Sequence, residues 1–160
     1  AVVQAEEGEL YPSVAGSDGT MGHVLACESR VQNDWQKKEA DRKTYIDMDG
    51  TAVFKFAVRK MPEMAKSLMT QMHCTEADID WFITHQANER IIEAIAKRLK
   101  SDIAKFPMNI AECGNTSSAS IPILLDEMNR SGQLKDGQKI IMAGFGAGLS
   151  WGAVYMEWHA

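Results

Sequence analysis

The sequence predicts a single α/β domain over residues 1–160, and three observations support that prediction. Short apolar segments, such as residues 79–83 and 139–143, have the length and composition of buried strands. Between them lie longer segments whose apolar residues recur every three or four positions, as in amphipathic helices. The chain closes on two expected strands, 139–143 and 149–158, joined by a glycine-rich turn. Alternating strands and helices favour a sheet covered by helices.

The composition argues against several classes of protein. A net charge of -5 over 160 residues disfavours nucleic acid as the main partner. No apolar run approaches the roughly 20 residues of a membrane span, and no signal peptide is recognisable. The three cysteines, Cys27, Cys74 and Cys113, form no Cys-x-x-Cys pair, so neither a zinc site nor a disulfide framework is indicated. We expect a cytoplasmic protein.

The first third of the chain predicts short strands followed by a polar segment. Strands are expected over 2–6, 10–15 and 23–27, the last two around a turn at 16–19. Residues 28–43 are polar and charged, as in an exposed loop or an insertion. The opening residues resemble a strand already under way, which suggests a piece of a longer protein.

A long helix is expected over residues 51–72, because apolar side chains recur there at spacings of three and four. Its expected inner stripe comprises Phe54, Ala57, Met61, Ala65, Leu68 and Met72. Pro62 falls inside the segment and should kink or interrupt the helix. Residues 74–78 then form a linker with a helix-cap pattern.

Two shorter helices follow the buried strand at 79–83. Asn88 is expected to cap the first, which ends near Leu99. The second is expected to begin at Thr116 or Ser117 and to end at Arg130. Their expected core-facing residues are Ile91, Ile92, Ile95, Leu99, Ile121, Leu124, Leu125 and Met128.

Two polar side chains lie at positions typical of functional sites. His85 follows a predicted strand and precedes a helix, where α/β proteins concentrate functional residues. It is either catalytic or a structural histidine. Asn115 lies between Gly114 and a run of small hydroxyl residues, so it either caps a helix or belongs to a site. Both side chains can donate a hydrogen bond to a developing oxyanion.

The glycine-rich segment 144–148 is not a dinucleotide fingerprint, because Leu149 and Trp151 stand where the third glycine is required. It is either a plain hairpin turn or a turn that offers a backbone amide to an oxyanion. Cys113 lies two residues before Asn115, but the expected helix starts several residues later, which disfavours a nucleophilic thiol.

Basic residues gather on or just beyond the helix after Asn88, namely Arg90, Lys97 and Lys100. They form either a solvated helix face or a surface for an acidic partner.

Together these motifs resemble the C-terminal half of β-ketoacyl–acyl carrier protein synthase III, a condensing enzyme of the thiolase-like fold. The matching segments are His85-Gln86-Ala87-Asn88, Gly114-Asn115-Thr116-Ser117-Ser118-Ala119-Ser120-Ile121-Pro122, Gly144-Phe145-Gly146-Ala147-Gly148-Leu149-Ser150-Trp151-Gly152, and Met48-Asp49-Gly50. The resemblance is weakest over residues 28–43. It implies a mixed sheet with helices on both faces, a homodimer, and a cysteine-bearing N-terminal half that is absent from this chain.

The resemblance implies a Cys-His-Asn site in which His85 and Asn115 stabilise an enolate. In that pattern the cysteine takes an acyl group from acyl-CoA, malonyl-acyl carrier protein loses CO2, and the resulting carbanion attacks the acyl thioester. The backbone amide of Ala147 matches the oxyanion-hole position. The family's cysteine lies in the N-terminal half, so this chain alone is expected to be inactive. Acyl-CoA is a substrate, and neither a cofactor nor a metal is implied.

The resemblance also implies contacts to acyl carrier protein and its pantetheine arm. The residues at those positions are Gln86, Ala87, Asn88, Glu89, Arg90, Lys97, Lys55, Thr51 and Phe54. The sequence departs from the family at Ala147, which replaces a glycine, and at Thr51, which replaces a common asparagine. Two other functions stay open: a condensing enzyme of secondary metabolism, and a non-catalytic subunit that binds a carrier protein.

Overall fold

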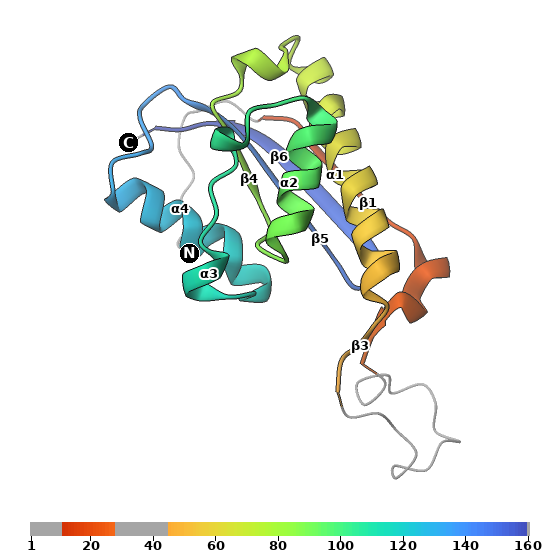
Figure 1. Ribbon diagram of the computed structural model, residues 1–160. Coiled ribbons are helices and arrows are strands. Elements are labelled where there is room, and N and C mark those ends of the chain that lie inside the picture. Colours follow the sequence, from red (N-terminus) through yellow and green to blue (C-terminus); the bar gives the residue numbers. More distant parts are fainter. Residues whose placement is uncertain (1–10, 28–44, 160) are drawn as a thin grey trace, which may run out of the picture.

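The structure, a computed structural model, describes residues 11–27 and 45–159 and contains a mixed four-stranded sheet with helices on both faces (Figure 1). The strand order is β1-β6-β5-β4. The strands are β1 (Ser13–Ser17), β4 (Trp81–Thr84), β5 (Lys139–Gly146) and β6 (Ser150–Glu157). β4 and β5 are parallel, whereas the other pairs are antiparallel. The predicted α/β class is therefore confirmed. The strand expected over 2–6 and the polar segment 28–43 lie outside the described residues.

Helices α1 (Gly50–Gln71) and α2 (Glu89–Leu99) cover one face of this sheet. The main core forms between them and strands β4, β5 and β6. Asn88 caps α2 as expected, because its side chain accepts a hydrogen bond from the Arg90 N–H.

Two expectations about α1 need correction. Of the kink or interruption expected at Pro62, the interruption is wrong, because the helix is continuous from Gly50 to Gln71. A proline inside a helix costs about 3 kcal/mol, and the tightly packed inner face around it, with Pro62 itself buried, offsets that cost. Phe54 does not belong to the inner stripe, because it is 36% exposed while Val53 and Phe56 are buried.

Helix α4 (Ser120–Arg130) covers the opposite face, where it packs on β4 and β5. A 3₁₀ turn, Ser117–Ala119, precedes it, so the regular helix begins later than expected. The short helix α3 (Ile110–Cys113) was not expected from the sequence.

The N-terminal strands are shifted from their expected positions. The strand expected over 10–15 is β1 (Ser13–Ser17), which pairs with β6. Of the strand expected over 23–27, only β2 (Leu25–Ala26) forms, because the two residues before it end a 3₁₀ helix, Gly19–Val24. Asp18 favours the helix because its carboxylate accepts from the Thr20 N–H at its first turn. β2 pairs with β3 (Asp47–Met48) in a separate two-stranded sheet.

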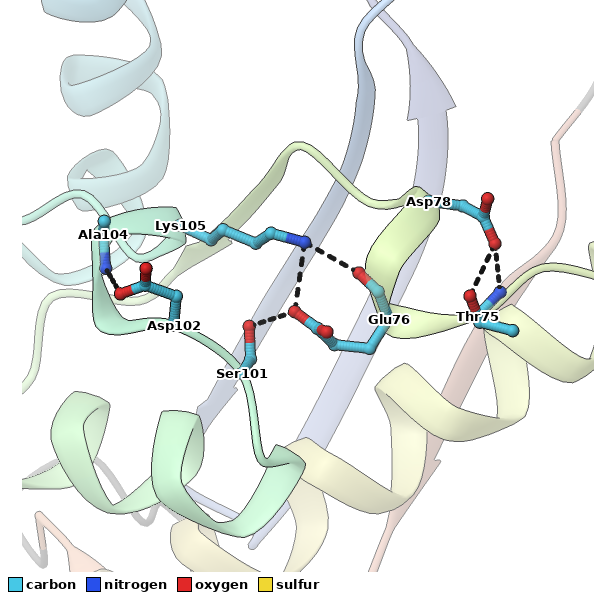
Figure 2. Close-up of polar contacts among 7 residues, drawn as sticks. All are labelled: Thr75, Glu76, Asp78, Ser101, Asp102, Ala104 and Lys105. Atoms are coloured by element: carbon cyan, nitrogen blue, oxygen red, sulfur yellow. Dashed lines mark hydrogen bonds and ion pairs between the residues drawn. The ribbon is translucent and has the colours of Figure 1, made fainter.

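A polar network joins the segment after α1 to the segment after α2 (Figure 2). Thr75 and Asp78 form a capping box, which confirms the cap expected there. Lys105 Nζ lies 3.1 Å from the Glu76 carboxylate and donates to the Glu76 backbone carbonyl at 2.9 Å, and Ser101 donates to the same carboxylate. Within the described ranges, none of the helices combines the length and apolarity needed to cross a membrane.

Candidate active site

His85 lies one residue beyond β4, at the edge of the sheet. Its backbone N–H donates to the Ala143 carbonyl at 2.9 Å, so it continues the parallel pairing of β4 with β5. The half-buried imidazole meets the Phe145 ring edge to face, with centroids 5.6 Å apart. Burial lowers the pKa of His85 below its ordinary value. The sheet thus holds the backbone of His85, and Phe145 packs against its ring.

Close polar contacts through Ser120 and Ser117 link Asn115 to His85. His85 Nδ1 lies 2.7 Å from Ser120 Oγ, and the same oxygen lies 2.9 Å from the Ser117 carbonyl oxygen. The Ser117 N–H donates to Asn115 Oδ1 at 3.0 Å. Because this bond uses the amide oxygen, the Asn115 NH2 group is left to donate elsewhere. This bond is the kind that a capping asparagine makes, and it leaves the NH2 group free for a ligand, so the geometry fits both interpretations of Asn115.

The glycine-rich segment lies against the same histidine. A Cβ on Gly144 would come within 3.9 Å of the His85 Cβ. Strand β5 extends through Gly146, farther than the expected end at residue 143, so the turn itself is only 147–149. Ala147 is exposed in this turn. The structure therefore joins His85 to the two other motifs, through Ser120 and through Phe145.

The Gln86 side chain does not fit its expected role as a carrier or pantetheine contact. Its side chain is fully buried, at 0% exposure. The amide donates to the backbone carbonyls of Thr84 and Pro107, and its oxygen accepts from the Asn109 N–H. The Gln86 side chain is therefore internal support for the loop that carries His85, not a ligand contact.

The other expected carrier contacts, apart from half-buried Ala87, are exposed at the first turns of α1 and along α2. Asn88, Glu89 and Arg90 begin α2, and Lys97 lies in its last turn. Thr51, Phe54 and Lys55 lie in the first turns of α1, where Asp49 caps the helix.

A groove of about 470 Å³ lies beside α1. Phe54 and Lys55 line it together with Arg59 and Arg98, which the sequence analysis did not single out. Arg59 follows Lys55 by four residues, a spacing that places both on one helix face. That spacing could have identified Arg59 from the sequence. Arg98 belongs to α2, and its place beside the groove depends on tertiary packing.

The cysteines carry no sign of nucleophilic chemistry. Cys113 donates to the Glu127 carboxylate at 3.6 Å. Burial first, and then that carboxylate, raise the pKa of the Cys113 thiol, so the thiol form is favoured over the reactive thiolate. Burial also raises the pKa of Cys74. In the part of the chain that the structure describes, no cluster of three or more His, Cys, Asp or Glu side chains forms a metal site.

Comparison with known proteins links the chain to one family. The family model described as "3-Oxoacyl-[acyl-carrier-protein (ACP)] synthase III C terminal" matches residues 69–158. A β-ketoacyl-[acyl-carrier-protein] synthase III of Clostridium novyi is 43% identical over 159 residues, covering 99% of this chain and 49% of the relative. The corresponding protein of Acaryochloris marina is 49% identical over 114 residues, 71% of this chain and 34% of the relative. The chain spans about half the length of the curated relatives that match it end to end.

Solved structures show the same fold. A 3-oxoacyl-(acyl carrier protein) synthase III from Pseudomonas aeruginosa superposes with a TM-score of 0.85 at 36% identity, covering 100% of this chain and 47% of that chain. The priming β-ketosynthase of the R1128 polyketide biosynthetic pathway gives a TM-score of 0.82 at 33% identity, covering 92% of this chain and 44% of that chain. The predicted thiolase-like fold is confirmed by this likeness.

Proposed function

Because this chain belongs to the 3-oxoacyl-[acyl-carrier-protein] synthase III family, we propose that it is the C-terminal half of a condensing acyltransferase that initiates fatty-acid synthesis. The proposed reaction joins an acyl group from acyl-CoA to malonyl-acyl carrier protein with loss of CO2. Acyl-CoA enters as a substrate, and no resident cofactor takes part. The cysteine nucleophile belongs to a further half of the enzyme. The complete enzyme is a homodimer.

One observation carries this proposal: polar contacts through Ser120 and Ser117 connect the His85 imidazole to the Asn115 amide. These contacts hold both side chains before any ligand binds. Donors that are already oriented stabilise developing charge without reorganisation during the reaction. Two neutral donors suit an enolate, whose charge develops only in the reaction.

The proposed chemistry assigns a step to each group. The carbon–carbon bond to the malonyl carboxylate breaks, CO2 leaves, and the electron pair becomes an enolate on the thioester oxygen. His85 and Asn115 donate hydrogen bonds to that oxygen. The enolate carbon then attacks the acyl-cysteine carbonyl, whose oxyanion accepts from the Ala147 amide until the cysteine thiolate is expelled.

The proposed carrier-docking surface comprises Arg90, Lys97 and Lys55, together with Arg59 and Arg98 beside the groove. All five side chains are cationic, and Lys55, Arg59 and Arg98 line the same groove as apolar Phe54. Carrier proteins are acidic, so this surface offers them charge complementarity. The apolar groove suits the pantetheine arm.

The test separates decarboxylation from acyl loading in the complete enzyme. His85→Ala and Asn115→Ala should each reduce malonyl decarboxylation by about 100- to 1,000-fold, the usual cost of one oxyanion donor. Loading of the cysteine should change far less, because the thiolate attacks acyl-CoA without forming an enolate. His159→Ala and Asn129→Ala, which alter exposed residues of the same types, should leave both steps unchanged. Normal decarboxylation in His85→Ala and Asn115→Ala would remove these residues from the mechanism.

A second candidate is a condensing enzyme that primes secondary metabolism. The observation that favours it is the fold shared with the R1128 priming β-ketosynthase. Both candidates use the same donors and differ in the acyl starter. Comparing turnover of acetyl-CoA with that of longer and branched acyl-CoA thioesters distinguishes them. A non-catalytic subunit, the remaining alternative, predicts no loss of product in His85→Ala.

A further inference from the structure

Ser120 lies at the centre of these contacts, although the sequence analysis assigned it no role. Among the described residues it is one of four buried polar side chains, at 2% exposure. Its hydroxyl oxygen lies 2.7 Å from His85 Nδ1, 2.9 Å from the Ser117 carbonyl oxygen and 3.3 Å from the Gln86 N–H, which donates to it. A hydroxyl has one hydrogen to donate. That hydrogen can therefore go to His85 or to Ser117, and not to both.

The choice determines which nitrogen of His85 carries the proton. If the hydroxyl donates to Ser117, the imidazole must donate from Nδ1, and a neutral ring then has only a lone pair at Nε2. If the hydroxyl donates to Nδ1, the neutral ring carries its hydrogen on Nε2. Only the second arrangement gives a neutral ring that can donate from Nε2 to a substrate.

Two observations favour donation to His85. Nδ1 is the nearer acceptor, at 2.7 Å from the hydroxyl oxygen against 2.9 Å for the Ser117 carbonyl oxygen, and that carbonyl keeps the backbone N–H of Ser120 as its donor. Within residues 11–27 and 45–159, Nδ1 has only Ser120 as a hydrogen-bond partner. In the same described ranges Nε2 has no partner, and it does not occur among the fully buried atoms that lack one. Nε2 is thus the ring nitrogen open to a ligand.

We propose that Ser120 is a positioning residue that donates its hydroxyl hydrogen to His85 Nδ1 and thereby holds the imidazole in the Nε2–H tautomer. This inference rests on the proposed function, in which His85 donates to the thioester oxygen. Ser117 completes the arrangement, since its N–H orients the Asn115 amide. One turn after Asn115 therefore orients both donors, the amide through a backbone N–H and the imidazole through a hydroxyl.

The tautomer is measured without any variant. The complete enzyme is labelled with 15N-histidine, and long-range 1H–15N spectra are recorded at neutral pH, with the His85 signals identified by their loss in His85→Gln. The expected spectrum has a protonated Nε2 and an unprotonated Nδ1 shifted by an accepted hydrogen bond. A proton on Nδ1 would overturn the proposal, whether or not His85→Ala abolishes decarboxylation. The two proposals can therefore fail separately.

A kinetic test uses Ser120→Ala with Ser118→Ala as the matched control. Ser120→Ala should lower kcat for malonyl decarboxylation about tenfold, the value of one lost hydrogen bond, with KM and acyl loading nearly unchanged. The Nδ1 resonance should move toward that of a nitrogen without a donor. Ser118→Ala, which removes an exposed hydroxyl from the same turn, should alter none of these quantities. An unchanged kcat in a folded, loadable Ser120→Ala enzyme would contradict the proposal.

Discussion

The lowered pKa of His85 suits the proposed donor to an enolate. Burial holds its pKa below the ordinary value of about 6.5, so the ring is neutral at neutral pH. A charged imidazolium would attract the malonyl carboxylate in the ground state and oppose loss of CO2. Because catalysis requires interactions that strengthen in the transition state, a neutral N–H serves better than a cation.

Gly16 is a residue whose missing side chain supports the site indirectly. It pairs across the sheet with Trp151, and a Cβ there would lie 2.5 Å from the indole ring. The ring has little freedom to move, because Phe56 meets it at 5.5 Å between centroids and Lys60 Nζ lies 4.9 Å from its centroid. Phe56 also touches Phe145, the residue that packs on the imidazole.

Gly16→Ala should therefore destabilise the complete enzyme by about 1–3 kcal/mol, the usual cost of overpacking. The matched control is Gly19→Ala, because a Cβ on Gly19 meets nothing within 4 Å. That control should change the free energy of unfolding by less than about 0.5 kcal/mol. Urea unfolding measures both, and equal stability of the two variants would contradict the packing argument.

At the scale of elements, the Glu76 network holds two connections together. Hydrogen bonds from Ser101 first, and then Lys105, lower the pKa of Glu76. Its side chain and that of Lys105 are only 28% and 26% exposed. A folded-state pKa below the unfolded value means that the stabilisation is present above about pH 4.3. It is lost as the pH falls through the lowered pKa.

Glu76→Gln should cost about 1 kcal/mol at pH 7, and the difference from the unmodified enzyme should shrink below about pH 4. The control is Asp126→Asn, which breaks an ion pair whose side chains are 55% and 79% exposed. Exposed pairs contribute little, so this control should change stability by less than about 0.5 kcal/mol. Urea unfolding at the two pH values checks both variants. A pH-independent deficit in Glu76→Gln would show that charge is not the cause.

Features set by neighbouring residues were predictable, and those set by distant contacts were not. The Asn88 cap and the inner face of α2 depend on local spacing, and both were predicted correctly. The pairing of β1 with β6 joins opposite ends of the described chain, and no local pattern encodes it. The helical spacing allowed either Phe54 or Val53 to face the core. In the folded chain Val53 is buried and Phe54 is exposed.

The same distinction holds within the site. The residues next to His85 and Asn115 made them candidates, and the family resemblance gave them their expected roles. Ser120 stands in a run of similar small residues, and only its contact with a residue 35 positions away distinguishes it. The family resemblance assigned Gln86 to carrier or pantetheine binding, whereas its burial depends on the segment around Asn109. Tertiary contacts therefore decide which polar residue faces inward.

At the scale of the whole molecule, the basic surface on α2 provides a test of carrier docking. Arg90→Glu combined with Lys97→Glu should raise KM for malonyl-acyl carrier protein about tenfold and flatten its salt dependence. The reaction with malonyl-CoA should change little, because that substrate lacks the acidic protein. The control pair Arg130→Glu and Lys135→Glu makes the same change of charge at the end of α4 and beyond it. Equal loss with both malonyl substrates would assign the α2 residues to folding or to the reacting centre.

Several large apolar side chains are exposed in the described part of the chain. Three of these side chains lie in or beside β3, where Tyr45 is 61%, Ile46 70% and Met48 56% exposed. On the sheet face opposite α1, helix α4 packs on β4 and β5, while Val154 on β6 is 37% exposed. Exposed apolar patches promote association. We therefore expect the 160-residue chain by itself to dimerise or aggregate unless the cysteine-bearing half is present.

The isolated chain should also be catalytically silent. It offers His85, Asn115 and the Ala147 amide, but Cys113 is a poor substitute for the nucleophile because burial and Glu127 raise its pKa. Incubation with radiolabelled acetyl-CoA and malonyl-acyl carrier protein should give neither labelled protein nor ketoacyl product, and addition of the cysteine-bearing half should restore both. A Cys113→Ser variant controls for adventitious labelling. A labelled adduct on Cys113, lost in that variant and accompanied by product, would make this chain a self-sufficient acyltransferase and would contradict the division of the active site between two halves.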